Sequence, residues 1–365
     1  FFLFLIDSIY ILLRKKSSNN LQAITIVRLD AIGDFIIYIS SRNLVPKEFS
    51  RYKKILICNE LVFELAKSLR IFDEIIPVNL KKFNFNLLYR LKILSTVSRI
   101  RCMVTLHPTF SRCFKTGDTI VRFLPSRIKI GFNGDFVNQN KFFRMISDCW
   151  YSELVQPDPF VKMEIERNHE FIEKVSNKKI SFKKFIPTLK TDVNFLGLNT
   201  EKFILISPGA SSLYKCWPSI RFQELIEKIL EKYNFNIVLC GTRSEELFIK
   251  QIKNNINSRF VGLSLDQTLL EYIELVRNAE LLIGNDSSSI HIANFVNTKS
   301  ICLYGGILPG RFLPYPKGIK NAPLVASKSD CKIKNWSCLK SHNCLNQILV
   351  EDVMNLVDKI FNGGE

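Results

Sequence analysis

Residues 279–306 constrain the fold more than any other part of this 365-residue chain. The apolar run 281–283 predicts a buried strand that stops at Gly284, and a cluster of Asn, Asp and Ser suited to a helix start follows it. A short helical pattern then leads to a second apolar strand at 300–304. Parallel sheets built from such units bind anions at the carboxyl ends of their strands, near helix N-termini.

The same alternation of strand and helix patterns runs along most of the chain. It predicts strands at 23–29, 53–58, 74–78, 101–106 and 127–132. An irregular stretch rich in Asn, Lys and Phe follows, and the alternation restarts near residue 202. The pattern favours an α/β protein with two doubly wound, Rossmann-like domains that face each other across a cleft.

We expect the following division of the chain. Residues 1–20 form an apolar and basic N-terminal segment, 21–195 a first Rossmann-like domain, 196–347 a second one, and 348–365 a C-terminal helix. Residues 1–13 are mostly apolar but too short to span a bilayer, and three basic residues follow at 14–16. They fit two structures equally well, an anchor on a membrane surface or a terminal helix packed on its own domain.

Charge and cysteine content say less about the partner, the cellular compartment and metal binding. The net charge of +17 calls for an anionic partner, although lysines scattered among Asn, Ile and Phe also arise from base composition of the gene. Most of the ten cysteines stand alone in apolar runs, which favours a reducing cytoplasm. Cys331, Cys338 and Cys344 lie near His342, but they contain no CxxC pair, so we favour free thiols over zinc and expect no metal.

In the first domain, the sequence RLDAIGD at 28–34 follows the first strand. We expect Gly33 to allow a tight turn there and Asp34 to act as a general base for an attacking hydroxyl. The alternative is that Asp34 only caps a helix that begins at Phe35.

In the second domain, the sequence SPGASS at 207–212 follows a strand and is followed by Lys215. Gly209, Ser211 and Ser212 suit a loop that wraps phosphates with N–H and hydroxyl groups, while Lys215 adds a positive charge. The spacing of a Walker loop is missing. An ordinary capped turn with a solvated lysine fits about as well.

Two further positions follow strand ends in the second domain. Glu245 is placed to accept hydrogen bonds from ribose hydroxyls, and its charge also favours the N-terminus of its own helix. Glu246 is an alternative for the ribose contact. Ser287 and Ser288 stand at the start of a helix, where hydroxyls and N–H groups suit a diphosphate, and Asp286 before them is placed to orient the loop or contact the sugar.

His291 lies one turn later in the same helix. For this residue we favour a bracing role over proton transfer, because a lone histidine is usually structural.

Taken together, RLDAIGD, SPGASSLYKCWP, CGTRSEE and GNDSSSIHIANFVNTKSICLYGG resemble the heptosyltransferases of lipopolysaccharide core synthesis, glycosyltransferase family 9. The resemblance covers about residues 22–355. It implies a GT-B fold and inverting transfer from an ADP-sugar, usually ADP-heptose, with no further cofactor. No Asp-x-Asp motif is present, so we expect metal-independent transfer.

By position, the resemblance implies a role for each candidate residue. Asp34 corresponds to the catalytic base; Ser211, Ser212 and Lys215 to the phosphate loop and its lysine; Glu245 to the acid near the nucleoside; and Asp286, Ser287, Ser288 and His291 to an Asp-Ser/Thr-Gly-x-x-His signature. Ser288 departs from the glycine that the family usually has. Arg112 and Lys115 lie in the segment where the family meets its acceptor, and we expect them to bind an anionic one.

We therefore expect a cytoplasmic GT-B glycosyltransferase. Its predicted partners are a nucleotide-sugar donor and a lipopolysaccharide-core or glycolipid acceptor, with peripheral contact to the inner membrane left open and no nucleic acid. Two alternatives remain, a GT-B hydrolase or epimerase acting on the nucleotide sugar, and a non-catalytic binder of anionic lipid.

Overall fold

The computed structural model describes residues 2–13, 23–41, 44–160, 162–181, 184–185, 202–211, 215–254, 256, 258, 260–306, 308–328 and 344–363. It divides into two compact units, which we consider separately. The first unit is Phe1–Phe160 with Ile165–Lys184, and the second is Val161–Glu164 with Phe185–Glu365. The domain boundaries expected from the sequence stay predictions, and the chain near residue 195 lies outside the described residues.

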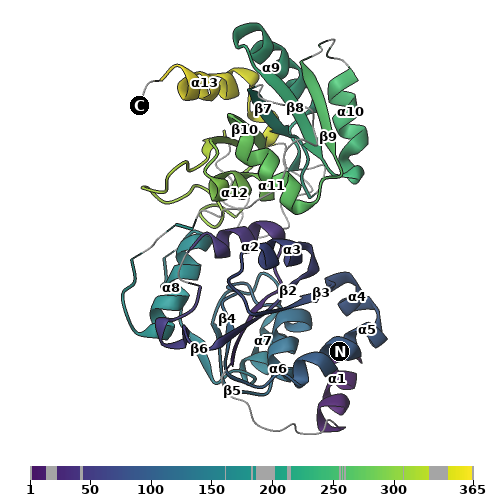
Figure 1. The fold of residues 1–365 in the computed structure, drawn as a ribbon, viewed down its shortest axis with the longest axis vertical. Coiled ribbons are helices and arrows are strands. Elements are labelled where there is room, and N and C mark those ends of the chain that lie inside the picture. The colour runs from purple at the N-terminus through teal and green to yellow at the C-terminus, as the bar shows by residue number, and fades with distance from the viewer. Residues whose placement is uncertain are drawn as a thin grey trace. The chain divides into compact units, whose positions relative to one another are not determined.

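The first unit contains a six-stranded parallel sheet in the order β3-β2-β1-β4-β5-β6 (Figure 1). Its strands are β1 (Ala23–Arg28), β2 (Lys53–Asn59), β3 (Glu74–Val78), β4 (Cys102–His107), β5 (Ser126–Phe132) and β6 (Glu153–Val155). All six residues of β1 are buried, as expected for a central strand covered on both faces. The order reverses between β1 and β4, and such switch points are where parallel sheets bind ligands.

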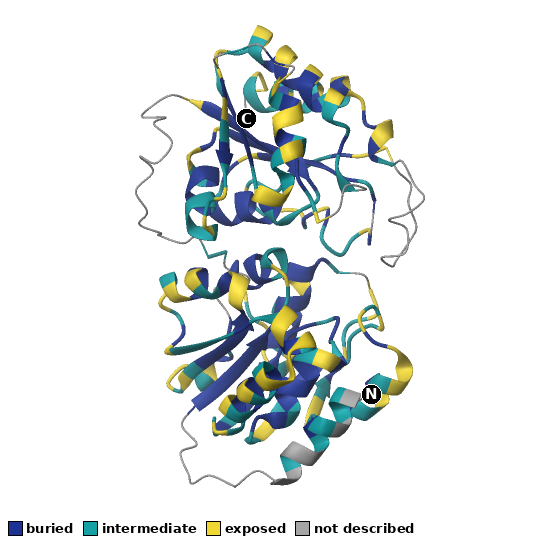
Figure 2. Ribbon diagram, turned by 90° about the vertical axis from the view of Figure 1, so that its right-hand side faces the viewer, coloured by how far each residue is buried: buried dark blue, intermediate teal, exposed yellow. Residues whose placement is uncertain are grey.

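Helices lie on both sides of this sheet (Figure 1). They are α1 (Phe2–Leu13), α2 (Ile32–Ile39), α3 (Phe63–Ser68), α4 (Leu80–Phe85), α5 (Leu87–Ser98), α6 (Thr119–Phe123), α7 (Lys141–Asp148) and α8 (Glu164–Ser176), with 3-10 turns at Lys47–Phe49 and Glu60–Val62 and a π-helical turn at Phe114–Asp118. Figure 2 shows the buried strands inside and the exposed residues on the outer helices.

The second unit repeats this plan with the strand order β12-β11-β10-β7-β8-β9, so its switch point lies between β10 and β7. Its strands are β7 (Phe203–Ser207), β8 (Asn236–Gly241), β9 (Val261–Leu265), β10 (Leu281–Asn285), β11 (Ser300–Leu303) and β12 (Leu324–Ala326). Its helices are α9 (Ser219–Lys232), α10 (Glu246–Asn254), α11 (Leu269–Asn278), α12 (Ser288–Val296) and α13 (Val350–Phe361), with 3-10 turns at Arg243–Glu245 and Leu345–Gln347.

The two doubly wound parallel sheets confirm the predicted fold class. The placement of the domains across a cleft stays a prediction. Sequence patterns did not reveal the edge strands β6 and β12, because three residues are too few for a periodic signal.

Helix α1 packs on the first unit through those of its side chains that the structure describes. Asp7 is 1% exposed and forms an ion pair with Arg90 of α5, at 2.5 Å. The hydroxyl of Ser8 accepts a hydrogen bond from Arg122, and the ring of Phe4 lies 5.6 Å from that of Phe114. The helix is therefore packed on its own unit, and contact of this segment with a membrane surface stays a prediction. Among the described residues, no helix is both long and apolar enough to cross a bilayer.

Candidate functional site

Arg28, the last residue of β1, joins the elements that meet at the switch point of the first sheet. Its buried guanidinium donates to the carbonyl oxygens of Pro108 and Asp34, at 3.1 and 3.3 Å, and to the side-chain oxygen of Asn168, at 3.2 Å. Its Nε lies 2.8 Å from a carboxylate oxygen of Asp30. One buried cation thereby fixes the loops after β1 and β4 and helix α8 relative to each other.

Asp34 lies in the first turn of α2, half-buried at the carboxyl end of β1. This position corrects two expectations. The helix begins at Ile32 and its N-cap is Ala31, so Asp34 is not the capping residue of a helix that starts at Phe35. Gly33 is part of the helix and is absent from the described glycines with positive φ, so it makes no left-handed turn. A carboxylate in the first turn is stabilised by the positive end of the helix dipole.

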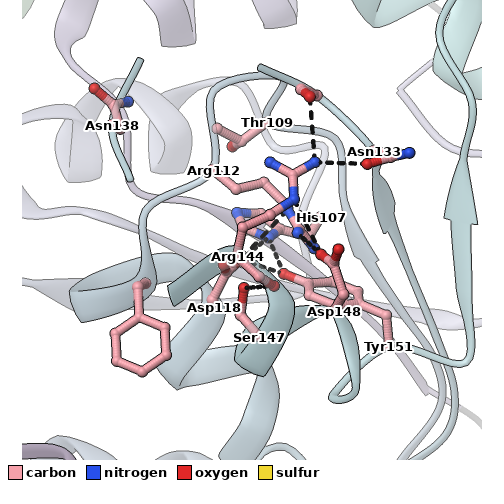
Figure 3. A network of polar contacts seen from close by, with 12 residues as sticks. His107, Thr109, Arg112, Asp118, Asn133, Asn138, Arg144, Ser147, Asp148 and Tyr151 are labelled. Carbon is pink, nitrogen blue, oxygen red and sulfur yellow. Dashed lines mark hydrogen bonds and ion pairs between the residues drawn. The ribbon is translucent and has the colours of Figure 1, made fainter. Parts of the chain in front are cut away.

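A network of buried charges closes the neighbouring loops of the first unit (Figure 3). Arg112 is fully buried, forms an ion pair with Asp148 of α7, and lies over the ring of Tyr151 at 4.5 Å. Arg144 of α7 donates to Asp148 at 3.0 Å and to the carbonyl oxygen of Asp135 at 2.9 Å. Helix α7 therefore holds the loops that follow β4 and β5.

The same network fixes the protonation of His107 at the end of β4. The Tyr151 hydroxyl donates to Asp118 at 2.6 Å, and Nδ1 of His107 lies 2.6 Å from that hydroxyl. With the hydroxyl proton used on Asp118, Nδ1 of His107 acts as the donor. Burial lowers the pKa of His107 to about 4, against the opposing charge of Asp118. The ring is therefore neutral at physiological pH.

This geometry argues against the acceptor-binding role expected for Arg112, because its guanidinium is buried among Asp118, Asp148 and Tyr151. The sequence could not reveal this, since the partner Asp148 is 36 residues away. Lys115, in the same segment, is exposed, so its ammonium group remains a candidate contact for an anion.

In the second unit, the loop that follows β7 is held at both ends by Asn285, the last residue of β10. This side chain is fully buried. Its amide nitrogen donates to the carbonyl oxygen of Pro208 at 2.6 Å, and its oxygen accepts from the backbone N–H of Trp217 at 3.0 Å. In the sequence, Asn285 is only one residue of a polar cluster, because neither bond is visible without the tertiary structure.

Gly209 and Glu245 lie against each other on the same side of this loop. A Cβ on Gly209 would come within 1.9 Å of a Glu245 side-chain oxygen, so a larger residue there would require the Glu245 carboxylate to move. The other Glu245 oxygen accepts from the backbone N–H and the hydroxyl of Thr242, both at 2.8 Å. Glu245 thus stabilises the start of its own helix, one of its two predicted roles, and also borders the loop.

Asp286 and Lys215 interact electrostatically beside this loop. Burial raises the pKa of Asp286 to about 6, and the positive charge of Lys215 opposes the shift. Ser211, at the other end of the described loop, is exposed, and Ser212 lies outside the described residues. The structure therefore brings Gly209, Glu245, Lys215 and Asp286 together around one loop.

Helix α12 starts directly after Asp286. Ser287 is its N-cap, and its hydroxyl accepts from the backbone N–H of Ser289; Ser288 is the first helical residue. Farther along, His291 is buried, its Nδ1 lies 3.0 Å from the hydroxyl of Tyr315, and burial lowers its pKa to about 4. This hydrogen bond is the kind of contact expected of a bracing histidine.

Of the three cysteines singled out in the sequence, the structure describes only Cys344, which is a free thiol. Cys331 and Cys338 lie outside the described residues. In the part of the chain that the structure describes, no group of three His, Cys, Asp or Glu side chains is arranged to hold a metal ion.

Known proteins resemble this chain in sequence. The family profile of glycosyltransferase family 9 (heptosyltransferase) matches residues 118–341, more than half of the chain. Lipopolysaccharide heptosyltransferase 3 of Escherichia coli K12 is 27% identical over 119 residues, which cover 32% of this chain and 34% of that protein. Lipopolysaccharide heptosyltransferase 1 of Campylobacter coli is 29% identical over 166 residues, 44% of this chain and 47% of that protein. Each match spans less than half of the relative's length.

Solved structures resemble the whole chain. A family 9 glycosyltransferase from Veillonella parvula superposes with a TM-score of 0.72 at 14% identity, covering 94% of this chain and 98% of that one. E. coli ADP-heptose lipopolysaccharide heptosyltransferase II gives 0.65 at 14% identity, covering 93% and 99%. E. coli heptosyltransferase WaaC with ADP gives 0.64 at 14% identity, with the same coverage. These likenesses show the GT-B fold, and the family profile shows that the chain belongs to glycosyltransferase family 9 (heptosyltransferase).

Proposed function

We propose that this protein transfers heptose from ADP-heptose to a hydroxyl group of a lipopolysaccharide-core acceptor, with inversion at the anomeric carbon. The matching family profile supports the reaction class, and the named activities of the curated relatives support the acceptor class. A solved neighbour that carries ADP supports the donor. The observation that carries the proposal is the loop after β7, which Asn285 fixes beside Lys215 and Asp286.

The second unit is suited to hold the donor. The departing diphosphate gains negative charge as the sugar leaves, and preorganised positive groups stabilise such charge without reorganising. Lys215 supplies a cation, and the N-terminus of α12 supplies a helix dipole and the hydroxyls of Ser287 and Ser288. We assign Ser211 and Ser212 to the same diphosphate, and Glu245 to the nucleoside.

Because the loop amides bind phosphate only if their N–H groups point the right way, the fixing of both loop ends matters. Asn285 holds Pro208 and Trp217, while Glu245 lies against Gly209 between them. Three separate contacts thus hold the described parts of the loop, 208–211 and 215–217, before a ligand arrives, which reduces the entropy lost on binding.

The first unit is suited to supply the base. Asp34 is held by the hydrogen bond from Arg28 to its own carbonyl oxygen, so its backbone position is fixed. We assign it to remove the proton from the acceptor hydroxyl while that oxygen bonds to the anomeric carbon and the bond to the diphosphate breaks. Attack from the face opposite the nucleotide inverts the configuration. Lys115 is our candidate contact for acidic groups of the acceptor.

The donor implies a cytoplasmic enzyme. A panel of donors tests the reaction directly. Purified protein is incubated with ADP-, UDP- and GDP-sugars, with and without lipopolysaccharide lacking core heptose, and products are analysed by mass spectrometry and NMR. We expect consumption of ADP-heptose only when acceptor is present, and an inverted linkage. Equal loss of ADP-heptose without acceptor would identify a hydrolase instead, and a retained linkage would contradict Asp34 as base for a single displacement.

A further inference from the structure

The corner between α4 and α5 exposes three large apolar side chains. Phe85, the last residue of α4, is 86% exposed, and Leu87 and Leu88 at the start of α5 are 38% and 80% exposed. A single exposed apolar side chain is normal, but three within four residues concentrate apolar surface at one corner of the unit. We call Phe85, Leu87 and Leu88 the apolar corner.

The chain around this corner carries positive charge and no negative charge. Residues 75–117 contain eight Lys and Arg and no Asp or Glu. Two of the eight, Arg90 and Arg112, are buried in ion pairs, whereas Lys81, Lys82 and Lys92 are exposed on α4 and α5. Outside this segment, the carboxylate of Glu60 accepts a hydrogen bond from the side chain of Asn79, the N-cap of α4.

Helix α1 lies beside this surface. Its Asp7 pairs with Arg90 of α5 at 2.5 Å, and Figure 1 shows α1 next to α5. The pairing neutralises the single acidic residue of α1 inside the unit. The carboxylate of Asp7 is therefore buried and does not offset the positive charge of the exposed lysines.

Another exposed apolar residue lacks this combination of several apolar side chains with exposed lysines. Leu247 of α10 is 85% exposed, but it directly follows Glu245 and Glu246. Glu246 pairs with Lys250 of the same helix, and one apolar side chain buries little area. Apolar side chains surrounded by lysines instead match the boundary of an anionic bilayer, with the apolar groups at the acyl chains and the ammonium groups at the phosphates.

We propose that the apolar corner, with Lys81, Lys82 and Lys92, binds the surface of an anionic lipid bilayer. This goes beyond the proposed reaction, since transfer of a sugar requires no lipid contact by the enzyme. It also assigns the contact to α4 and α5, whereas the sequence pointed only to residues 1–16. The vesicles used below contain no sugar acceptor, so their binding succeeds or fails independently of the proposed activity.

The apolar contribution is tested by flotation with vesicles of phosphatidylcholine alone or mixed with phosphatidylglycerol. We expect the full chain to float with the anionic vesicles, and the double variant Phe85→Ser, Leu88→Ser to bind at least about tenfold more weakly, because the hydrophobic area is lost. Leu247→Ser is the matched control, with a similar exposed fraction, and is expected to bind like the wild type. Thermal unfolding confirms that each variant is folded.

The charge contribution is tested by Lys81→Gln, Lys82→Gln, Lys92→Gln, for which we expect binding weaker by roughly fivefold per lysine at low salt. A control variant of equal net charge changes three exposed lysines elsewhere, Lys47, Lys317 and Lys359. Absence of vesicle binding, or an equal loss in the control variants, would overturn the proposal. Self-association without lipid that requires Phe85 and Leu88 would assign the corner to a second copy of the chain and overturn it too.

Discussion

The two sheets end in different ways at the edges where ligands are expected. In the first unit, the loops after β4 and β5 are closed by guanidinium groups that point inward to carboxylates, as in the pair of Arg112 and Asp148. In the second unit, the loop after β7 is held by a neutral amide, Asn285, and the charged groups Lys215 and Asp286 lie beside it.

The difference shows two ways in which the same fold holds a loop, by a buried ion pair or by a neutral amide. A buried ion pair uses its charges on each other, so it fixes loop shape but attracts no ligand. A neutral amide fixes the loop ends through hydrogen bonds alone, so no charge of the neighbouring Lys215 is used in that contact. We therefore expect changes in the first network to alter stability, and changes around the second loop to alter donor binding.

The largest effect is expected for Asp34→Asn, which keeps the side-chain shape and removes the base. We expect the turnover number to fall by about 10²–10⁴-fold, the usual contribution of a general base. ADP affinity, measured by calorimetry, should stay unchanged because the donor groups belong to the second unit. Near-normal turnover in this variant would contradict the mechanism.

The next effect separates structure from binding in the first unit. Arg112→Met removes the guanidinium beside Asp118 and leaves Asp148 with Arg144 as its remaining cation, and it should lower the free energy of unfolding of that unit by about 3–5 kcal/mol in urea. Lys115→Met, at an exposed position of the same segment, is the control and should change stability by less than about 0.5 kcal/mol. Unchanged stability with weaker acceptor binding would instead restore Arg112 as an acceptor contact.

The third effect tests the neutral amide. Asn285→Ala removes both loop contacts, and we expect ADP affinity to fall about tenfold, the equivalent of roughly one to two hydrogen bonds. Asn294→Ala is a close control, because Asn294 is also fully buried on the same unit and donates to two backbone carbonyls, those of Lys320 and Asn321. If both variants lose stability alike and neither loses ADP affinity, Asn285 is only structural.

The smallest effect is a pH dependence. The pKa of Asp286 is raised from 3.8 to about 6, so the folded protein favours the protonated form. Its contribution to stability is therefore most favourable below pH 4 and declines as the pH rises to about 6. Protonation also removes a negative charge beside the expected diphosphate.

ADP affinity should consequently rise modestly from pH 7 to pH 5.5 in the wild type. In Asp286→Asn this part of the dependence should vanish, while titration of ADP itself remains in both proteins. Calorimetry at both pH values measures the difference. An identical pH profile for the two proteins would show that Asp286 does not act on the ligand.

Much of the architecture followed from local sequence. Buried strands such as β1 and β7 were predictable because a parallel strand covered on both faces must be almost wholly apolar. The candidate residues Asp34, Lys215 and Asp286 were predictable in position because each follows a strand end in its motif. The start of α2 was not, since Ala31 caps it without a side-chain hydrogen bond and gives no signal.

Contacts between distant segments were decided only in the folded chain. Asp7 and Arg90 are 83 residues apart, and Asn285 is 77 and 68 residues from Pro208 and Trp217. Sequence periodicity reports which face of an element is buried, but not which partner it meets there. The sequence alone determined two parallel sheets with polar groups at their carboxyl ends. Tertiary packing decided which polar groups bond to each other, because each buried donor and acceptor takes the partner that folding brings within reach.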